Sequence, residues 1–136
     1  MKKYYLPFLP LADVNYLYLL AFYEIAEYQV NTNLYNTIRY SSLKTLAAQV
    51  KLSSSTVSRI LNSGKYADFM TADTERKVIT LKNNFKSGRK QPFVMLTAAE
   101  VELIRDKKDN LFAKYLIYLK YYCGYTKDGK NDFTAK

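Results

Sequence analysis

The sequence contains no histidine, no tryptophan and a single cysteine, Cys123. Without histidine the chain has no imidazole general base and no Ser–His or Cys–His nucleophile, and a zinc site of the Cys/His kind is nearly excluded. Only four glycines are present, and they form no Gly-rich phosphate loop. Paired carboxylates such as Asp106 and Asp109 lie in a charged, solvated stretch. We therefore expect that the protein is not an enzyme and needs neither a cofactor nor a metal ion.

Long hydrophobic runs are also missing. The apolar and aromatic run of residues 16–23 has eight members, whereas a membrane-spanning helix needs about 20. Two lysines precede an apolar stretch as in a signal peptide, but Pro7, Pro10 and Asp13 interrupt that stretch and no small-residue cleavage site follows. One cysteine cannot form an internal disulfide, which is typical of a reducing compartment. These absences predict a cytoplasmic protein with no membrane partner.

Acidic residues are scarce, and the excess of positive charge is unevenly placed. The whole chain has 21 Lys and Arg against 12 Asp and Glu, a net charge of +9. Residues 37–90 alone hold eleven basic residues against Asp68, Asp73 and Glu75. Charge concentrated in one segment favours a polyanionic partner. The other interpretation is a solvated basic surface that aids solubility.

The length and the 49% hydrophobic content fit one domain with a hydrophobic core. Apolar periodicity predicts a first helix over residues 10–30, whose broad apolar surface would be buried on more than one side. A polar linker over residues 31–36 and a short strand over residues 37–40 follow. Two further helices are then predicted, one from a cap at Ser41 or Ser42 to about Val50, the other from a cap at Ser53 or Ser54 to about Ser63, closed by Gly64.

The second half of the chain predicts a hairpin and a helical segment. Residues 77–81 and 92–96 have strand composition, and the turn-forming residues 83–91 would join them into a β-hairpin with a long tip. Thr97 and Glu100 match a capping box, so a helix begins at Ala98. It continues after a charged stretch over residues 111–123 and stops at Gly124, with one apolar stripe made of Leu111, Tyr115, Leu119 and Tyr122.

Residues 43–61 carry the pattern that points to a function. Their apolar residues fall where two short helices that cross steeply need contacts: Leu46, Ala47, Val50, Leu52, Val57 and Ile60. The outward side of the second helix is polar and uncrowded, as a helix that enters the major groove of DNA requires. Its outward residues are the candidates for base contacts: Ser54, Ser55, Ser58, Arg59 and Asn62.

The stretches Leu46-Ala-Ala-Gln-Val50 and Thr56-Val-Ser-Arg-Ile-Leu-Asn62 resemble a bacterial helix-turn-helix, and the second is similar to the recognition helix of Lac-repressor-type regulators. In that family the first residues of the recognition helix touch bases and an arginine further along supports the readout, which implies these roles for Ser54, Ser55 and Arg59. Lys51 stands at a turn position that usually holds glycine, so we expect a less tight turn. About forty residues precede the motif, unlike in that family.

The predicted order of helix, strand, helix-turn-helix, hairpin and helix instead resembles winged-helix proteins, in particular the small replication and regulatory proteins of plasmids, phages and integrative elements. The expected fold is mainly α with a small β-hairpin, a winged helix-turn-helix with extra N- and C-terminal helices over residues 1–124. Residues 125–136 would be a polar tail. The run Phe133-Thr-Ala-Lys136 is similar to the start of a further element in such replication proteins.

The predicted hairpin would be a basic wing. Between Arg76 and Lys90 the chain has six basic residues and no acidic one, and a basic tip can neutralise DNA phosphates. A hairpin whose lysines merely discourage aggregation is the other interpretation. The candidates for contacts to the DNA backbone are Arg39, Lys44, Ser53, Lys65, Lys82, Lys86, Arg89 and Lys90.

Together these features predict sequence-specific binding of double-stranded DNA, either in replication initiation or regulation of a mobile element or in transcription regulation. The alternative is a protein-interaction module that docks an acidic partner on its basic face. RNA binding is disfavoured because Phe93 is the only strong candidate for a surface aromatic on a strand. The broad apolar first helix and the Tyr-rich last helix hint at a homodimer. The tyrosines of the last helix could stack on bases, but their helical spacing is more typical of core or dimer packing: Tyr115, Tyr118, Tyr121 and Tyr122. Cys123, near these rings, is expected to be inert.

Overall fold

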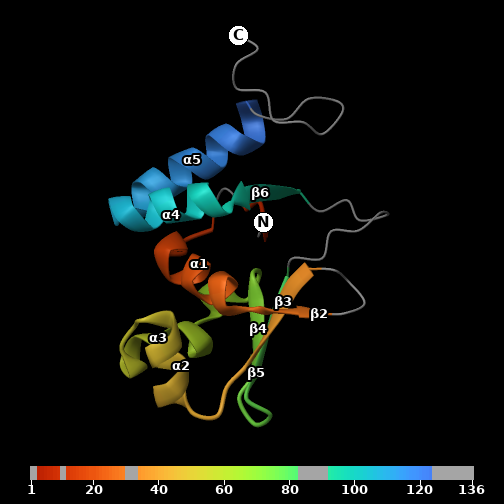
Figure 1. Ribbon diagram of the computed structural model, residues 1–136, viewed down its shortest axis with the longest axis vertical. Helices are drawn as coiled ribbons and strands as arrows, with labels where there is room; N and C mark the ends of the chain where they lie inside the picture. Colours follow the sequence, from red (N-terminus) through yellow and green to blue (C-terminus); the bar gives the residue numbers. More distant parts are fainter. Residues whose placement is uncertain (1–2, 10–11, 30–33, 83–91, 124–136) are drawn as a thin grey trace.

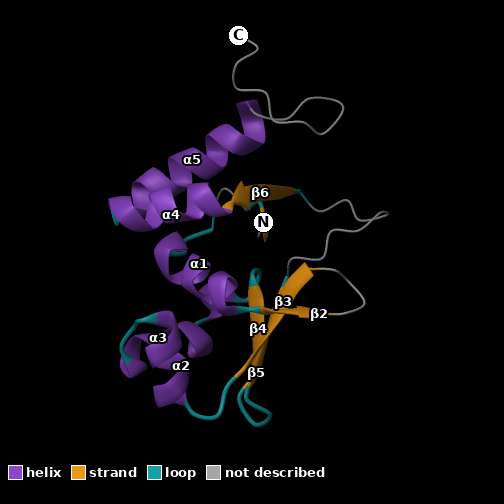
Figure 2. Cartoon of the chain, viewed as in Figure 1, coloured by secondary structure: helices purple, strands orange, loops and turns teal. Residues whose placement is uncertain are grey.

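The computed structural model describes residues 3–9, 12–29, 34–82 and 92–123. Within these residues the fold is mixed α/β, with five α-helices and two small antiparallel sheets (Figure 1, Figure 2). A mainly α fold with one hairpin was therefore too narrow a prediction. In chain order the elements are β1 (Lys3–Pro7), α1 (Tyr16–Ile25), β2 (Glu27–Gln29), β3 (Leu34–Arg39), α2 (Leu43–Val50), α3 (Ser54–Asn62), the 3-10 turn η1 (Gly64–Tyr66), β4 (Met70–Asp73), β5 (Val78–Leu81), β6 (Phe93–Thr97), α4 (Ala98–Lys107) and α5 (Asn110–Cys123).

The two sheets lie in different parts of the molecule (Figure 1). The larger sheet has the strand order β2-β3-β5-β4 and lies beside α2 and α3. The smaller sheet pairs β1 with β6, the first and last strands of the described chain, and lies beside α4 and α5. Helix α1 runs between the two parts and contacts α2, α4 and α5. The helix pair α2–α3 and the C-terminal helices thus both pack against α1.

The predicted hairpin is wrong, although both of its strands exist. Strand β5 pairs with β3 and β4, and β6 pairs with β1. In the larger sheet β4 and β5 form a hairpin, in which Asp73 is opposite Val78 and Met70 is opposite Leu81. Strand β4 was missed because three of its four residues are exposed and it carries no apolar run. The predicted tip, residues 83–91, lies outside the described residues.

Helix α1 is shorter than predicted. It begins after Asn15, whose side-chain oxygen accepts hydrogen bonds from the backbone N–H of Leu17 and Tyr18 at 2.9 and 3.4 Å. It ends at Ala26, where the backbone becomes extended and leads into β2. A polar cap thus fixes the start of the helix, and the change to an extended backbone at Ala26 fixes its end, while an apolar run alone does not show where a helix stops.

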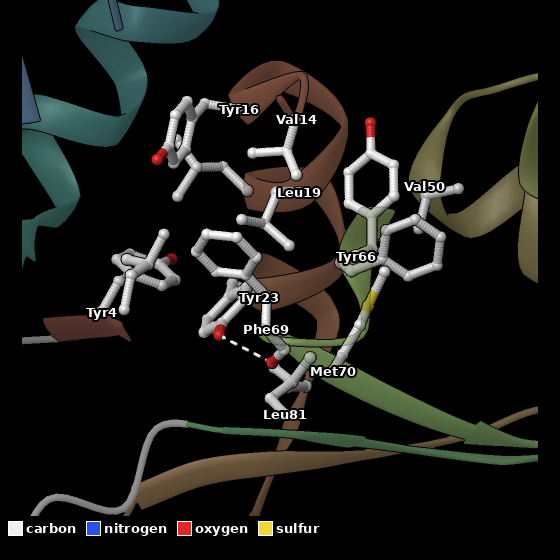
Figure 3. Close-up of a cluster of buried hydrophobic side chains, with 14 of the residues drawn as sticks. Tyr4, Val14, Tyr16, Leu19, Tyr23, Val50, Tyr66, Phe69, Met70 and Leu81 are labelled. Carbon is white, nitrogen blue, oxygen red and sulfur yellow. Dashed lines mark hydrogen bonds between the residues drawn. The ribbon is translucent and has the colours of Figure 1, made fainter. Parts of the chain in front are cut away.

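The core lies around α1 and the inner face of the larger sheet (Figure 3). Leu19, Phe22 and Tyr23 of α1 and Phe69 before β4 have at most 1% of their surface exposed. The Tyr23 hydroxyl donates a hydrogen bond to the Phe69 carbonyl oxygen at 3.2 Å (Figure 3). Burial raises the pKa of Tyr23, and it raises that of Tyr16 to about 12 with a smaller contribution from Tyr118. The core is therefore built partly from tyrosines that must stay protonated.

The predicted capping box is confirmed. The Thr97 hydroxyl accepts from the Glu100 backbone N–H at 3.2 Å, and the Glu100 carboxylate accepts from the Thr97 N–H at 2.8 Å. The same carboxylate oxygen lies 2.7 Å from the Lys120 ammonium, and Lys120 is 2% exposed. This ion pair joins α4 to α5.

The side of α5 that packs inward is not the predicted apolar stripe. The buried residues of α5 are Ala113, Ile117 and Lys120. The predicted stripe faces outward, with exposed fractions between 52% and 64% for Leu111, Tyr115, Leu119 and Tyr122. This stripe therefore does not pack into the core of the described chain. Cys123, which follows the stripe, is also exposed.

Candidate nucleic-acid interface

Helices α2 and α3 begin at the predicted serine caps. The Ser42 hydroxyl accepts a hydrogen bond from the Thr45 backbone N–H, and the Ser53 hydroxyl accepts one from the Thr56 N–H, both at 3.2 Å. Each cap satisfies an N–H group that the first turn of a helix leaves without a partner. The cap role of Ser53 uses the hydroxyl that was expected to contact DNA, although its side chain is exposed.

Lys51 closes the turn between the two helices. Its φ of 61° and ψ of 41° lie in the left-handed region, the conformation that glycine adopts most easily. The backbone N–H groups of Lys51 and Leu52 both donate to the Ala47 carbonyl oxygen, the second at 3.0 Å. The turn therefore closes on the end of α2 without a glycine, and the loosening expected from Lys51 is not seen.

The two faces of α3 are divided as predicted. Val57 and Ile60 are buried, with 0% and 3% of their surface exposed, and they lie on the side of α3 that packs against α2. Ser54, Ser55, Arg59 and Asn62 are exposed. Ser58 differs, because it is half-buried and its hydroxyl accepts a hydrogen bond from the Asn62 side-chain amide at 3.2 Å. Apart from Ser58, the predicted base-contact residues thus form one exposed polar face.

Arg59 is the only charged residue of α3. Among the described residues it makes no ion pair, so its guanidinium is available to an external acceptor. A guanidinium offers five N–H donors in a planar fork that matches a phosphate or the edge of guanine. The first turn of the helix, at Ser54 and Ser55, carries the positive end of the helix dipole.

The predicted backbone-contact residues are only partly brought together. Lys44 is exposed on α2 and Arg39 is exposed at the end of β3. Lys65 lies just after α3, and its ammonium is 3.4 Å from the carboxylate of Asp13. Lys82 follows β5 at the end away from the β4–β5 turn, since its N–H donates to the Phe69 carbonyl. Lys86, Arg89 and Lys90 lie outside the described residues.

A second hairpin turn, which the sequence interpretation missed, lies beside the start of α2. In this β4–β5 turn the Asp73 carboxylate accepts from the backbone N–H of Glu75 and Arg76 at 3.1 and 3.0 Å. Lys77 has a φ of 58°, and its ammonium donates to the Ser41 carbonyl oxygen at 2.9 Å. This bond ties the turn to the residues that precede α2. An aspartate followed by polar residues is a turn signal that could have identified it.

The positive charge is concentrated on the helix pair and not on the turn. Residues 37–67, which include α2 and α3, contain five basic residues and no acidic one. In the β4–β5 turn, Asp73 and Glu75 offset Arg76 and Lys77, and the Arg76 guanidinium lies 3.9 Å from Asp73. The strongest positive field is therefore expected over α2, the Lys51 turn and α3.

The described residues show no group of three Cys, Asp or Glu residues that could hold a metal ion. Over the same ranges, no helix is both long and apolar enough to cross a bilayer. What the arrangement offers chemically is a set of exposed hydroxyl, amide and guanidinium groups on one short helix, next to basic side chains. A comparison with protein-family models, curated proteins and solved structures finds no match to this chain.

Proposed function

We propose that this chain binds double-stranded DNA in a sequence-specific manner, with α3 in the major groove. The observation that carries the proposal is the exposed polar face of α3, where Arg59 makes no ion pair with any residue that the structure describes, on a segment that has five basic residues and no acidic one. Nine helical residues span about 13 Å, close to the major-groove width of about 12 Å. Such a helix can reach base edges while its neighbours contact the backbone.

The order and pairing of the elements support a winged-helix interpretation of this surface. Helix α1, strand β3, helices α2 and α3 and the β4–β5 hairpin follow one another, and β5 lies between β3 and β4. This arrangement resembles a winged helix in which β4–β5 is the wing, in place of the hairpin predicted from the sequence. The bond from Lys77 to Ser41 would hold the wing beside the helix pair. Arg76, whose side chain is 84% exposed, would reach a phosphate from its tip.

In this proposal Arg59 contacts a guanine, and Ser54, Ser55 and Asn62 contact neighbouring bases or phosphates. Lys44 and Arg39 contact phosphates at the edge of the groove. Phosphate contacts supply affinity that depends on salt, and base contacts supply specificity. The same surface would serve a transcription regulator or a replication or regulatory protein of a mobile element.

The test is selection of a binding site from random duplex DNA, followed by measurement of its affinity by fluorescence anisotropy at about 50 and 200 mM salt. The fall in affinity between the two salt concentrations reports the contribution of the phosphate contacts. Arg59→Ala should weaken binding to the selected site about 10- to 100-fold, because one bidentate base contact contributes about 1–3 kcal/mol. On random DNA the same change should have a much smaller effect. Lys3→Ala is the matched control and should leave both affinities unchanged, because Lys3 is exposed and pairs with Thr97 in the smaller sheet, which lies in a different part of the molecule from α3 (Figure 1).

Two results would contradict the proposal. The first is no binding to any duplex at the lower salt concentration. The second is an equal loss for Arg59→Ala on selected and random DNA, which would show that the arginine contacts only phosphates. With no DNA binding at all, the basic face would instead be assigned to docking of an acidic protein partner.

A further inference from the structure

A groove lies between α1, the α2–α3 turn and α4, with a volume of about 780 Å³. Helix α1 forms its floor, and the turn residues and α4 form two of its walls. Pockets that bind small molecules usually have volumes of about 300–1,000 Å³ and mostly apolar linings. The volume of this groove is within that range.

The floor of the groove is apolar. It includes Leu17, Ala21 and Ile25, which are half-buried residues on successive turns of α1. Leu52 of the α2–α3 turn and Ile104 of α4 also line the groove. The sequence predicted that α1 is buried on more than one side, and the groove is where the described chain leaves part of its apolar surface uncovered. This surface can take an apolar ligand body.

The charged residues around the groove are mostly basic. Lys51, Arg105 and Lys108 line it together with one acid, Glu24. Arg105 and Glu24 form an ion pair between α4 and α1. Lys51 and Lys108 make no ion pair within the described ranges. They stand at the C-terminal ends of α2 and α4, where each helix dipole contributes about half a negative charge. The three basic residues, the one carboxylate and the two helix ends together leave about one net positive charge at the groove.

We propose that this groove binds an amphipathic monoanion, an alkyl or aryl carboxylate, and that the bound ligand changes the affinity of the protein for DNA. The apolar part would lie on α1, and the carboxylate would lie between Lys51 and Lys108. The link to DNA follows from the lining, because Lys51 and Leu52 are also the turn that sets α3 against α2. Only this second part rests on the proposed function, and coupling between two sites is reciprocal.

The ligand site can be tested without DNA, using decanoate and its neutral analogue decanol to displace the fluorescent anion 1-anilinonaphthalene-8-sulfonate. Decanoate should displace the probe at lower concentration than decanol. The double variant Lys51→Gln/Lys108→Gln should weaken decanoate about three- to tenfold, as expected for exposed charge pairs, and should leave decanol unchanged. Ala21→Trp, which fills the floor, should abolish binding of both, whereas Ala99→Trp on the exposed side of α4 should not. Circular dichroism checks that each variant is folded.

Equal binding of decanoate and decanol, or an unchanged decanoate affinity in the double variant, would overturn the assignment of an anion. Binding that survives Ala21→Trp would overturn the location. The coupling is tested by repeating the DNA titration with saturating decanoate, where an affinity change of at least about fivefold is expected and should be absent in Ala21→Trp. An unchanged DNA affinity overturns the coupling alone. Absence of DNA binding in the ligand-free protein overturns the proposed function. The existence of the ligand site is then still decided by the displacement experiment alone.

Discussion

Replacing Lys51 by glycine should stabilise the protein, although it removes a side chain from the turn that positions α3. Lys51 has a φ of 61°, where the Cβ of an L-residue comes too close to the following carbonyl oxygen at a cost of about 1–2 kcal/mol. Glycine has no Cβ, but it loses more backbone freedom on folding, which costs about 0.5–1 kcal/mol. The expected result is a free energy of unfolding higher by about 0.5–1 kcal/mol.

Two further variants isolate the cause. Lys51→Ala removes the amine and its stem but keeps the Cβ, so the difference between alanine and glycine at this position reports the backbone conformation. Ala48 is an exposed, right-handed residue of α2 one turn before Lys51. There the change to glycine should lower the free energy of unfolding by about 0.5–1 kcal/mol. The glycine effect should thus have opposite signs at two positions three residues apart.

The assay is urea unfolding followed by circular dichroism, with the midpoint compared at unchanged slope. Lys51→Gly equal to or less stable than Lys51→Ala would refute the reasoning, because it would mean that the turn does not require a left-handed residue. Loss of stability in Lys51→Gly together with a changed slope would instead indicate an altered unfolded state and calls for the same comparison by thermal unfolding.

Three other predictions follow from polar and aromatic groups. Glu100→Gln should lower the free energy of unfolding by about 3 kcal/mol, because it leaves the Lys120 charge buried without its carboxylate. Lys120→Met, which removes the buried charge itself, should lower it by less than about 1 kcal/mol. Urea unfolding that finds Lys120→Met to be the less stable variant would contradict this. The pKa of Tyr16 is raised to about 12 in the folded protein, against an ordinary value near 10. Between about pH 10 and 12 the unfolded chain therefore loses the Tyr16 proton while the folded protein keeps it, and the free energy of unfolding falls by about 1.4 kcal/mol per pH unit. Below about pH 10 this contribution to stability is fully present. Tyr16→Phe should flatten that alkaline loss, and an identical pH profile of unfolding would refute it. We also propose that the exposed stripe of α5 pairs two copies of the chain, so Tyr115→Lys should shift sedimentation toward the monomer, and a wild-type chain that stays monomeric at all concentrations would exclude the pairing.

The helix pair could be predicted from the sequence because its signals are local. Ser42 and Ser53 cap the two helices, and each satisfies an N–H only three residues ahead. Val57 and Ile60 are spaced so that one side of α3 is buried and the other is free for polar residues. The positions of Ser54, Ser55, Arg59 and Asn62 on the exposed face follow from the same period, so most of the candidate site was predictable without tertiary information.

Strand pairing could not be predicted in this way, because it depends on residues distant in the chain. The compositions of β5 and β6 mark them as strands, and their closeness in sequence favours a hairpin. In the structure β6 instead pairs with β1, where Tyr4 is opposite Leu96. Nothing local to β6 shows that its partner is at the other end of the chain. The basic tip predicted from residues 83–91 depended on a β5–β6 hairpin, which does not form. For this reason the wing of the proposed winged helix is assigned to the β4–β5 turn.

Helix α5 shows why apolar spacing identifies a face without showing which face is buried. Two sides of α5 have helical spacing, one with leucines and tyrosines, the other with Ala113, Ile117 and Lys120. The second side is the buried one, because two contacts fix it. Glu100 at the start of α4 provides a carboxylate for Lys120. The Asn110 side chain accepts a hydrogen bond from the backbone N–H of Tyr16 in α1 at 2.7 Å and donates one to the carbonyl oxygen of Val14, just before α1. Burial of a lysine against a carboxylate that also caps a helix can be recognised only when both helices are in place. The larger, aromatic side is thereby left outward, where it can contact a second copy without disturbing the core.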